Sequence, residues 1–176
     1  MRKYEFTGET KTVDLWSRVA TLHRIRAVVE FGLVKVGDLG GWIEKEENLS
    51  HDGKAWVVGN AWVVGNARVV GNARVDGDAW VVGNARVGGN AEVFSASHVL
   101  VIGAIGSRDD FTTFFRDKDN EITVKCGCFL GKIDKFLEKV TQTHGDSKYA
   151  LVYRAAVEVA RLQIDFSGEA PKDADE

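Results

Sequence analysis

A six-residue repeat fills the middle of the chain and constrains its fold more than any other feature. From Ala55 the sequence reads AWVVGN, AWVVGN, ARVVGN, ARVDGD, AWVVGN and ARVGGN, and it then decays through AEVFSA and SHVLVI. Six residues advance an α-helix by about 600°, so a helix would scatter the repeated valines around its circumference. Glycine and β-branched residues also disfavour a helix. The period therefore predicts short strands joined by tight corners.

Each unit supplies a valine, from Val57 to Val99 in steps of six, and most units supply an alanine two places earlier. Side chains alternate between the two faces of a strand, so both residues should point inward. The Gly-Asn and Gly-Asp pairs predict turns, because glycine tolerates positive φ and Asn or Asp bonds to nearby backbone. An antiparallel sheet of valine-rich hairpins is the alternative, but units of this length leave too little room for both strands and turns.

These units resemble those of hexapeptide-repeat proteins, in which three units form one triangular coil of a left-handed parallel β-helix. The resemblance implies a short left-handed parallel β-helix over residues 43–105, with Ile43 to Asn48 and Leu49 to Lys54 as degenerate units in the same frame. This gives about three coils, and stacking at about 4.8 Å gives a height on the order of 15 Å. A stack this short requires caps at both ends.

The flanking segments supply those caps, so the expected fold class is mainly β with a small α+β module. Residues 1–42 read as short extended pieces and predict an N-terminal β cap. Residues 106–166 predict a ββαα module, with a hairpin around Asp117 to Asn120 and helices over Ile133 to Val140 and Tyr149 to Leu162. Residues 167–176 hold four acids against one base. We expect this last segment to be a disordered acidic tail.

Composition excludes several classes of function. The formal net charge is −3, and the tail accounts for the acidic excess, so the chain lacks the broad basic field of a general nucleic-acid-binding protein. The first residues lack the apolar core of a secretion signal, and no later stretch approaches the roughly 20 apolar residues that cross a membrane. Cys126 and Cys128 are too close in sequence for a loop-closing disulfide and suit a reducing compartment. We expect a cytoplasmic protein with no membrane partner.

One face of the predicted coil is unusually apolar. Residues 18 apart should stack, which places on this face Trp62, Val64, Trp80, Val82, His98 and Leu100. Covering one tryptophan stabilises by at most about 4 to 6 kcal/mol. We expect the face to be the interface of a homo-oligomer, and the family resemblance favours a trimer. The alternative is that the N-terminal segment or the C-terminal module covers it.

The C-terminal module concentrates hydroxyl groups and cations. The candidate ligand-binding residues are Ser107, Arg108, Thr112, Thr113, Lys125, His144 and Lys148. Such groups hold phosphate by charge-assisted hydrogen bonds, although the same residue types are common on the surface of any small module. We expect no catalytic residue and no cofactor. We also expect no metal site, because Cys126, Cys128 and His144 are too few ligands for zinc.

Several flanking segments resemble uncharacterised hexapeptide-repeat proteins of bacteriophages and prophages. The similar segments are Leu22 to Ala27, Gly37 to Glu44, Glu47 to Ser50, Ile105 to Phe115, Lys125 to Phe129 and Thr143 to Tyr149. The resemblance implies a non-enzymatic, oligomeric accessory protein in the bacterial host cytoplasm. Such a protein would bind a host defence protein or a small anionic ligand such as a nucleotide, and so antagonise host defence. The alternatives are an acyltransferase-like enzyme that uses His98 or His144, and a scaffold without a ligand.

Overall fold

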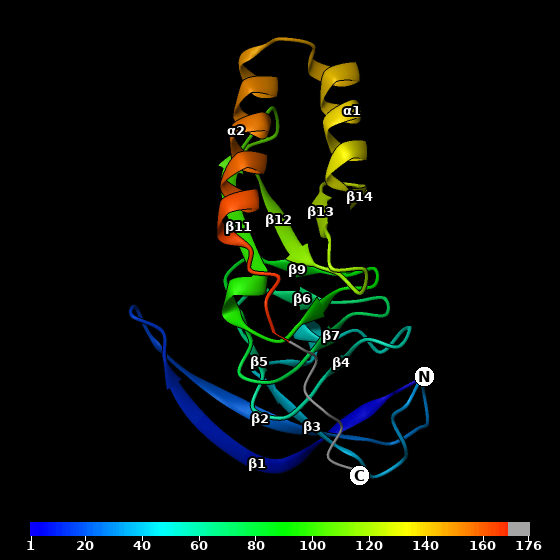
Figure 1. The fold of residues 1–176 in the computed structure, drawn as a ribbon. Helices are drawn as coiled ribbons and strands as arrows, with labels where there is room; N and C mark the ends of the chain where they lie inside the picture. Colours follow the sequence, from blue (N-terminus) through cyan, green and yellow to red (C-terminus); the bar gives the residue numbers. More distant parts are fainter. Residues whose placement is uncertain (169–176) are drawn as a thin grey trace.

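The chain builds three regions that lie one above another in the computed structural model, which describes residues 1–168 (Figure 1). An N-terminal hairpin lies at one end, the hexapeptide segment lies in the middle, and a sheet with two helices lies at the other end. The prediction of a mainly β protein with a small helical module is confirmed.

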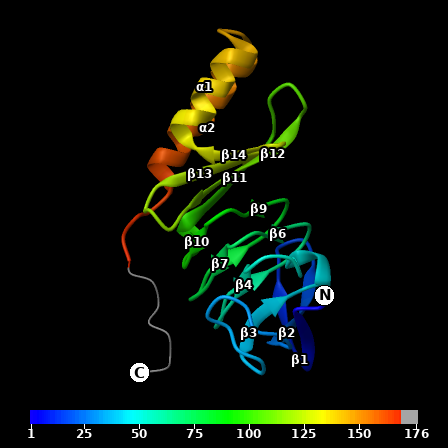
Figure 2. The ribbon, with the colours of Figure 1, turned by 90° about the vertical axis from the view of Figure 1, so that its right-hand side faces the viewer.

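The hexapeptide segment forms two-residue strands that alternate among sheets. In chain order they are β4 (Trp56–Val57), β5 (Trp62–Val63), β6 (Arg68–Val69), β7 (Arg74–Val75), β8 (Trp80–Val81), β9 (Arg86–Val87) and β10 (Glu92–Val93). Within residues 1–168, β4, β7 and β10 form one sheet, β6 and β9 a second, and β5 and β8 extend a third. All of these pairs are parallel and join residues 18 apart. Residues 18 apart therefore stack, as expected (Figure 2).

The core of this segment consists of the repeated alanines and valines. The valine of every strand from β4 to β10 is fully buried, and so are the alanines that precede these strands. The glycine at most corners has φ between 60° and 70°, which a side chain rarely tolerates. The repeat therefore specifies both the alanine and valine that face the core and the glycine corner at which the chain turns toward the next strand.

The start of the repeat differs from the predicted frame. Ile43 pairs with Val63, and Leu49 bridges to Val69, so these partners are 20 residues apart and not 18. The predicted frame put Ile43 and Leu49 at the alanine positions of their units, whereas both are buried at valine positions, opposite Val63 and Val69. The prediction was wrong because the corner between Leu49 and β4 is two residues longer than the others.

The N-terminal cap is a long antiparallel hairpin. Strands β1 (Tyr4–Asp14) and β2 (Val19–Ala27) pair with each other, and β2 pairs with β3 (Leu39–Ile43). A 3-10 turn, η1 (Glu46–Asn48), follows. Because β3 pairs with β5 in parallel, the hairpin continues the sheet of β5 and β8. Tyr4 is fully buried, and its hydroxyl lies 2.9 Å from the carbonyl oxygens of Glu46 and Leu49. The cap is therefore anchored to the first turn of the coil.

The C-terminal module contains more strands than the sequence predicted. Its elements are η2 (Ala96–His98), β11 (Val99–Ile105), β12 (Asp110–Arg116), β13 (Ile122–Cys126), β14 (Phe129–Lys132), α1 (Ile133–His144) and α2 (Lys148–Gln163). The β12–β13 hairpin and both helices are present, but β11 and β14 flank the hairpin, so the ββαα prediction was wrong about the sheet. The SHVLVI unit has no Gly-Asn corner, and Val99 pairs with Phe115 in the module instead of stacking on Val81.

Strand β12 closes the upper end of the coil, while the helices cover the other side of its sheet (Figure 2). Phe115 is fully buried in the coil core, and its neighbour Phe114 is buried among the helices. The Thr113 hydroxyl accepts a hydrogen bond of 3.0 Å from the Arg86 amide of β9. Alternate residues of one strand thus join the coil to the module.

The sequence also predicted that no segment crosses a membrane and that the chain ends in an acidic tail. No helix in the described part of the chain is long and apolar enough to cross a lipid bilayer. The acidic tail expected over residues 167–176 lies outside the described residues, apart from Ser167 and Gly168.

The turn between β12 and β13 depends on one buried carboxylate. Asp117 is 3% exposed and accepts hydrogen bonds from the Thr123 hydroxyl (2.6 Å), the Lys132 ammonium (2.6 Å) and the amides of Asp119 (2.9 Å) and Glu121 (3.3 Å). Burial alone would raise the pKa of Asp117, but the bonds from Lys132 and Thr123 outweigh it and hold the pKa below its ordinary value. The charged form is therefore the one that stabilises the fold.

Asp117→Asn should lower the free energy of unfolding by about 1.5 to 3 kcal/mol near neutral pH, because hydrogen bonds to a charged group are lost. The lowered pKa makes this stabilisation complete above the ordinary carboxylate pKa of about 4, and it is lost as the pH falls through the lowered value. Urea unfolding of both proteins at neutral and at strongly acidic pH checks this. The gap between them should shrink in acid, and an equal gap at both pH values would contradict the assignment.

Candidate functional site

A pocket of about 190 Å³ lies at the outer end of the C-terminal module. The loop between β11 and β12 and the turn between β13 and β14 form one side of it, and α1 and α2 form the other. Its floor is apolar and aromatic, with Cys126, Phe129, Phe136 and Tyr153. Its rim is polar, with Ser107, Arg108, Lys139 and His144. The pocket therefore combines an apolar, aromatic lining with side chains that can donate hydrogen bonds.

Helical spacing directs α1 into this pocket. Phe136, Val140 and His144 follow one another at intervals of four, and Lys139 lies on the same side. From α2, the Tyr153 ring meets Phe136 edge-on at 5.6 Å between centroids and stacks on His144 at 5.8 Å. These ring contacts fix the imidazole at the mouth of the pocket.

Tyr153 also connects the helix to the sheet. The Cys126 sulfur lies 3.9 Å from the phenol oxygen and donates to it. Burial, aided by Cys126, raises the pKa of Tyr153 to about 12, so the phenol keeps its proton. Gly106 passes directly over the phenol with φ of 77°, and a Cβ at this position would lie 1.9 Å from the Tyr153 oxygen. A side chain at position 106 would collide with Tyr153. The loop that carries Ser107 and Arg108 can therefore lie this close to Tyr153 only with glycine at position 106.

The cations of the rim form no ion pair within the described part of the chain. Neither Arg108 nor Lys139 forms an ion pair with a described residue, and both side chains are exposed. Asp110 is the acidic residue of the lining, and its carboxylate accepts the Phe111 amide. The rim therefore carries an excess of positive charge that an anion can neutralise.

Only part of the predicted ligand-binding set gathers here. Ser107, Arg108 and His144 line the pocket. Thr112 and Thr113 are both 1% exposed and bond within the protein, to Cys126 and to Arg86. The Lys125 ammonium bonds to the Gly127 carbonyl, and neither Lys125 nor Lys148 belongs to the lining.

Sequence reasoning missed Lys139 and Tyr153. It ended the first helix at Val140 and so placed His144 in a loop, whereas α1 extends to His144. With the longer helix, Lys139 and Thr143 are four residues apart, as are Val140 and His144, so the spacing would have predicted two neighbouring pairs.

The six residues of the predicted interface face lie in different surroundings: some pack against the hairpin, some against the C-terminal module, and some are exposed. Trp62 and Trp80 stack at 5.3 Å between ring centroids. Val64 is 1% exposed and packs on Ala20 and Leu22 of β2, so the hairpin covers this part.

The two remaining members of the set, His98 and Leu100, lie against the C-terminal module. His98 is 3% exposed, and its Nδ1 accepts the Phe94 amide. Its Nε2 lies 3.4 Å from Arg116, and burial together with Arg116 lowers the pKa of His98. Leu100 packs against the helical core. Trp80 and Val82 are the members that stay exposed, at 48% and 40%.

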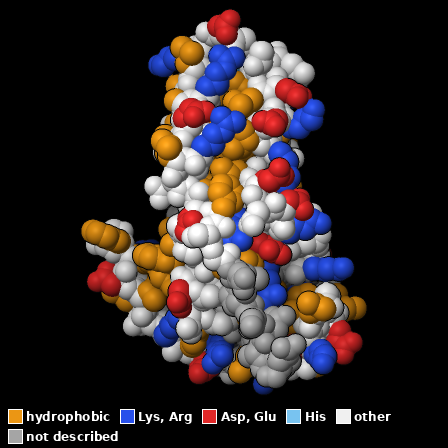
Figure 3. Space-filling model, in the orientation of Figure 1, with side chains coloured by type: hydrophobic (Ala, Val, Ile, Leu, Met, Phe, Trp, Pro, Cys, Tyr) orange, Lys and Arg blue, Asp and Glu red, His pale blue; other side chains and the backbone are white. Residues whose placement is uncertain are grey.

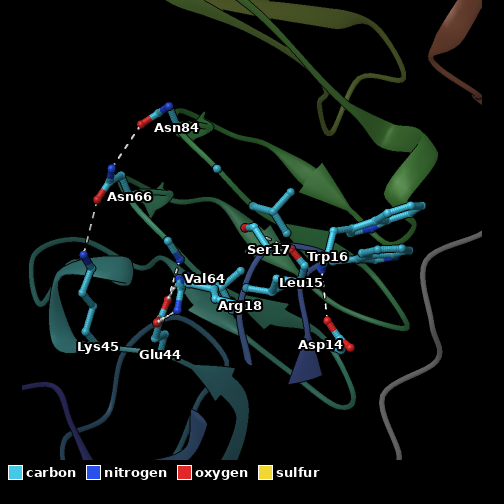
Figure 4. Close-up of a pocket in the computed structure, with 14 residues that line it drawn as sticks. Asp14, Leu15, Trp16, Ser17, Arg18, Glu44, Lys45, Val64, Asn66 and Asn84 are labelled. Atoms are coloured by element: carbon cyan, nitrogen blue, oxygen red, sulfur yellow. Dashed lines mark hydrogen bonds and ion pairs between the residues drawn. The ribbon is translucent and has the colours of Figure 1, made fainter. Parts of the chain in front are cut away.

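A larger, open groove of about 540 Å³ lies beside Trp80 and Val82. Its other wall is the loop at the tip of the β1–β2 hairpin (Figure 4). Arg18 of this loop forms a two-point ion pair with Glu44 at 2.5 and 2.8 Å, and Glu44 also accepts the Gly65 amide at 2.7 Å. The bond from Arg18 is the main reason that the pKa of Glu44 lies below its ordinary value. The hairpin tip is therefore tied to the coil.

A cluster of carboxylates at the β12–β13 turn has the composition of a metal site. Asp117, Asp119 and Glu121 place oxygens within 4.8 Å of one another. The Lys132 ammonium lies 2.6, 3.1 and 2.7 Å from these three carboxylates. The Lys132 ammonium therefore lies where a cation would bind and offsets part of the charge of the three carboxylates.

Comparison with models of known protein families finds no match, and comparison with curated proteins finds no similar sequence. The functional conclusions below therefore depend on the geometry of this chain.

Gly106→Ala should destabilise the protein more than Gly145→Ala. Both glycines have positive φ, which makes alanine unfavourable by about 1 to 2 kcal/mol, but no atom lies within 4 Å of a Cβ at Gly145. At Gly106 the methyl group must displace Tyr153, which adds about 1 to 3 kcal/mol of overpacking. Urea unfolding of the two variants measures the difference. Equal losses would show that the loop does not press on Tyr153.

Proposed function

We propose that this chain is a non-enzymatic binding protein whose C-terminal pocket takes a small anionic ligand of nucleotide type. One observation carries the proposal: Arg108 and Lys139, which lack ion-pair partners among the described residues, flank an aromatic floor. Cations at the rim suit a phosphate or carboxylate group, and the aromatic floor suits a planar ring.

The size of the pocket limits how much of the ligand it encloses. Pockets for drug-sized molecules usually measure about 300 to 1,000 Å³, so 190 Å³ suits one end of a nucleotide. The remainder would lie outside, near the exposed side chains of Arg108 and Lys139. The ligand is therefore held by a buried ring or anionic group and by the surface charges around it.

We extend the proposal to the origin and architecture that the sequence resemblance implies. The coil is proposed to be a left-handed parallel β-helix, supported by parallel pairs that join residues 18 apart. The protein is proposed to be a phage or prophage accessory protein that sequesters a host signalling nucleotide and so antagonises defence. The acyltransferase alternative is weaker because His98 is buried and bonded inside the protein, which leaves His144 as the base.

The direct test is calorimetric titration of the purified chain with AMP, adenosine and inorganic phosphate. AMP should bind best, because it alone offers both the ring and the anion. Arg108→Ala and Lys139→Ala should each weaken AMP binding by about tenfold or more, the effect of losing a charge-assisted hydrogen bond.

Lys148→Ala is the matched control, since it removes an exposed cation from the same module outside the pocket. It should leave AMP binding unchanged. An absence of binding by all three probes, or equal weakening by Lys148→Ala, would contradict the proposal. If AMP binds as expected, mass spectrometry of small molecules released on denaturing freshly purified protein identifies the natural ligand.

A further inference from the structure

The tip of the N-terminal hairpin carries apolar side chains that the described residues leave uncovered. Trp16 is fully exposed, at 103%, and Val19 is exposed at 65%. In Figure 3, hydrophobic side chains gather at the end of the projecting hairpin and on the neighbouring body of the molecule. With Trp80 in the groove, the indoles alone expose on the order of 300 Å² of apolar surface, since a tryptophan side chain presents about 150 to 250 Å². The largest apolar patch on a monomer usually measures about 300 to 600 Å² and is often functional.

The backbone holds the Trp16 indole outward. Trp16 has φ of 64°, a conformation that bulky residues rarely adopt, and its amide donates to the Asp14 carboxylate at 3.1 Å. The ion pair of Arg18 with Glu44 fixes the same loop against the coil (Figure 4). Strained backbone that the surroundings enforce is typical of functional positions.

We propose that a second copy of this chain covers this surface, and that Trp16 of each copy enters the groove beside Trp80 of its neighbour. The projecting indole and the groove lie next to each other on the same chain. A surface that carries both halves of a contact is self-complementary, as a symmetric interface requires. Trp16 also belongs to the lining of the groove on its own chain, so the neighbouring copy then covers the parts of Trp16, Trp80 and Val82 that one chain leaves exposed.

Charge and area both favour a second copy over a foreign partner. Asp14 and Glu44 balance Arg18 and Lys45 around the groove, so two copies of this surface do not repel each other. A strongly acidic or basic partner would find no complementary charge there. A standard interface takes about 800 Å² from each partner, and a little over half of it is apolar. The two indoles, with Val19 and Val82, supply most of that apolar share.

Light scattering coupled to gel filtration, with sedimentation equilibrium over a wide concentration range, tests the proposal. The wild-type protein should have a mass of at least two 19.3 kDa chains. Trp16→Glu should shift it to a single chain, with a dissociation constant raised about 30-fold or more, as expected for a central tryptophan. Because Trp16 is fully exposed in the protomer, its replacement leaves the monomer fold intact, and circular dichroism verifies this. Trp80→Glu should dissociate the protein in the same way.

Leu33→Glu is the control, because Leu33 is 85% exposed in the loop between β2 and β3, away from the hairpin tip. It should leave the mass unchanged. A wild-type chain that stays monomeric at every concentration would overturn the proposal and leave the groove to a foreign partner. An oligomer that survives both tryptophan substitutions would overturn it as well, by placing the interface elsewhere.

Discussion

The structure depends on hydrogen bonds between backbone segments that are 18 residues apart. The Trp56 amide donates to the Ala73 carbonyl at 2.9 Å, and the Arg68 amide donates to the Ala85 carbonyl at 2.9 Å. Each bond forms only when the chain completes a full turn with its valines inside. The six-residue period of the sequence places the valines so that this turn and its backbone bonds form together. A strand of two residues cannot persist alone, and it is stable here because it stacks on the next turn.

Both proposed functional surfaces are positioned by this stack. Arg18 reaches Glu44 next to β3, and Glu44 binds the Gly65 amide, so the hairpin tip is located relative to the coil corner. At the other end, the Thr113 hydroxyl accepts the Arg86 amide of β9, which belongs to the coil, and Phe115 fills the end of the coil core. The coil thus separates the exposed Trp16 indole at one end from the pocket of the C-terminal module at the other.

The sequence predicted those parts of the fold that depend on local periodicity. The strands, the corners and the two helices follow from the positions of valine, glycine and the apolar residues of α1 and α2. The predictions were wrong where spatial neighbours decide the outcome. The long corner after Leu49 breaks the frame, and Val99 joins β12 because that partner covers the open end of the coil. The groove was not foreseen, since no local pattern reveals that Arg18 reaches Glu44.

The stacking itself can be measured with a designed crosslink. The Asn66 and Asn84 side chains lie 3.3 Å apart at stacked corners, 18 residues from each other. In a background without Cys126 and Cys128, cysteines at Asn66 and Asn84 should form an intramolecular disulfide on mild oxidation. Cysteines at Asn66 and Asn90, which belong to different corners, should not. Equal crosslinking of the two pairs, or crosslinking of only the second pair, would contradict the account.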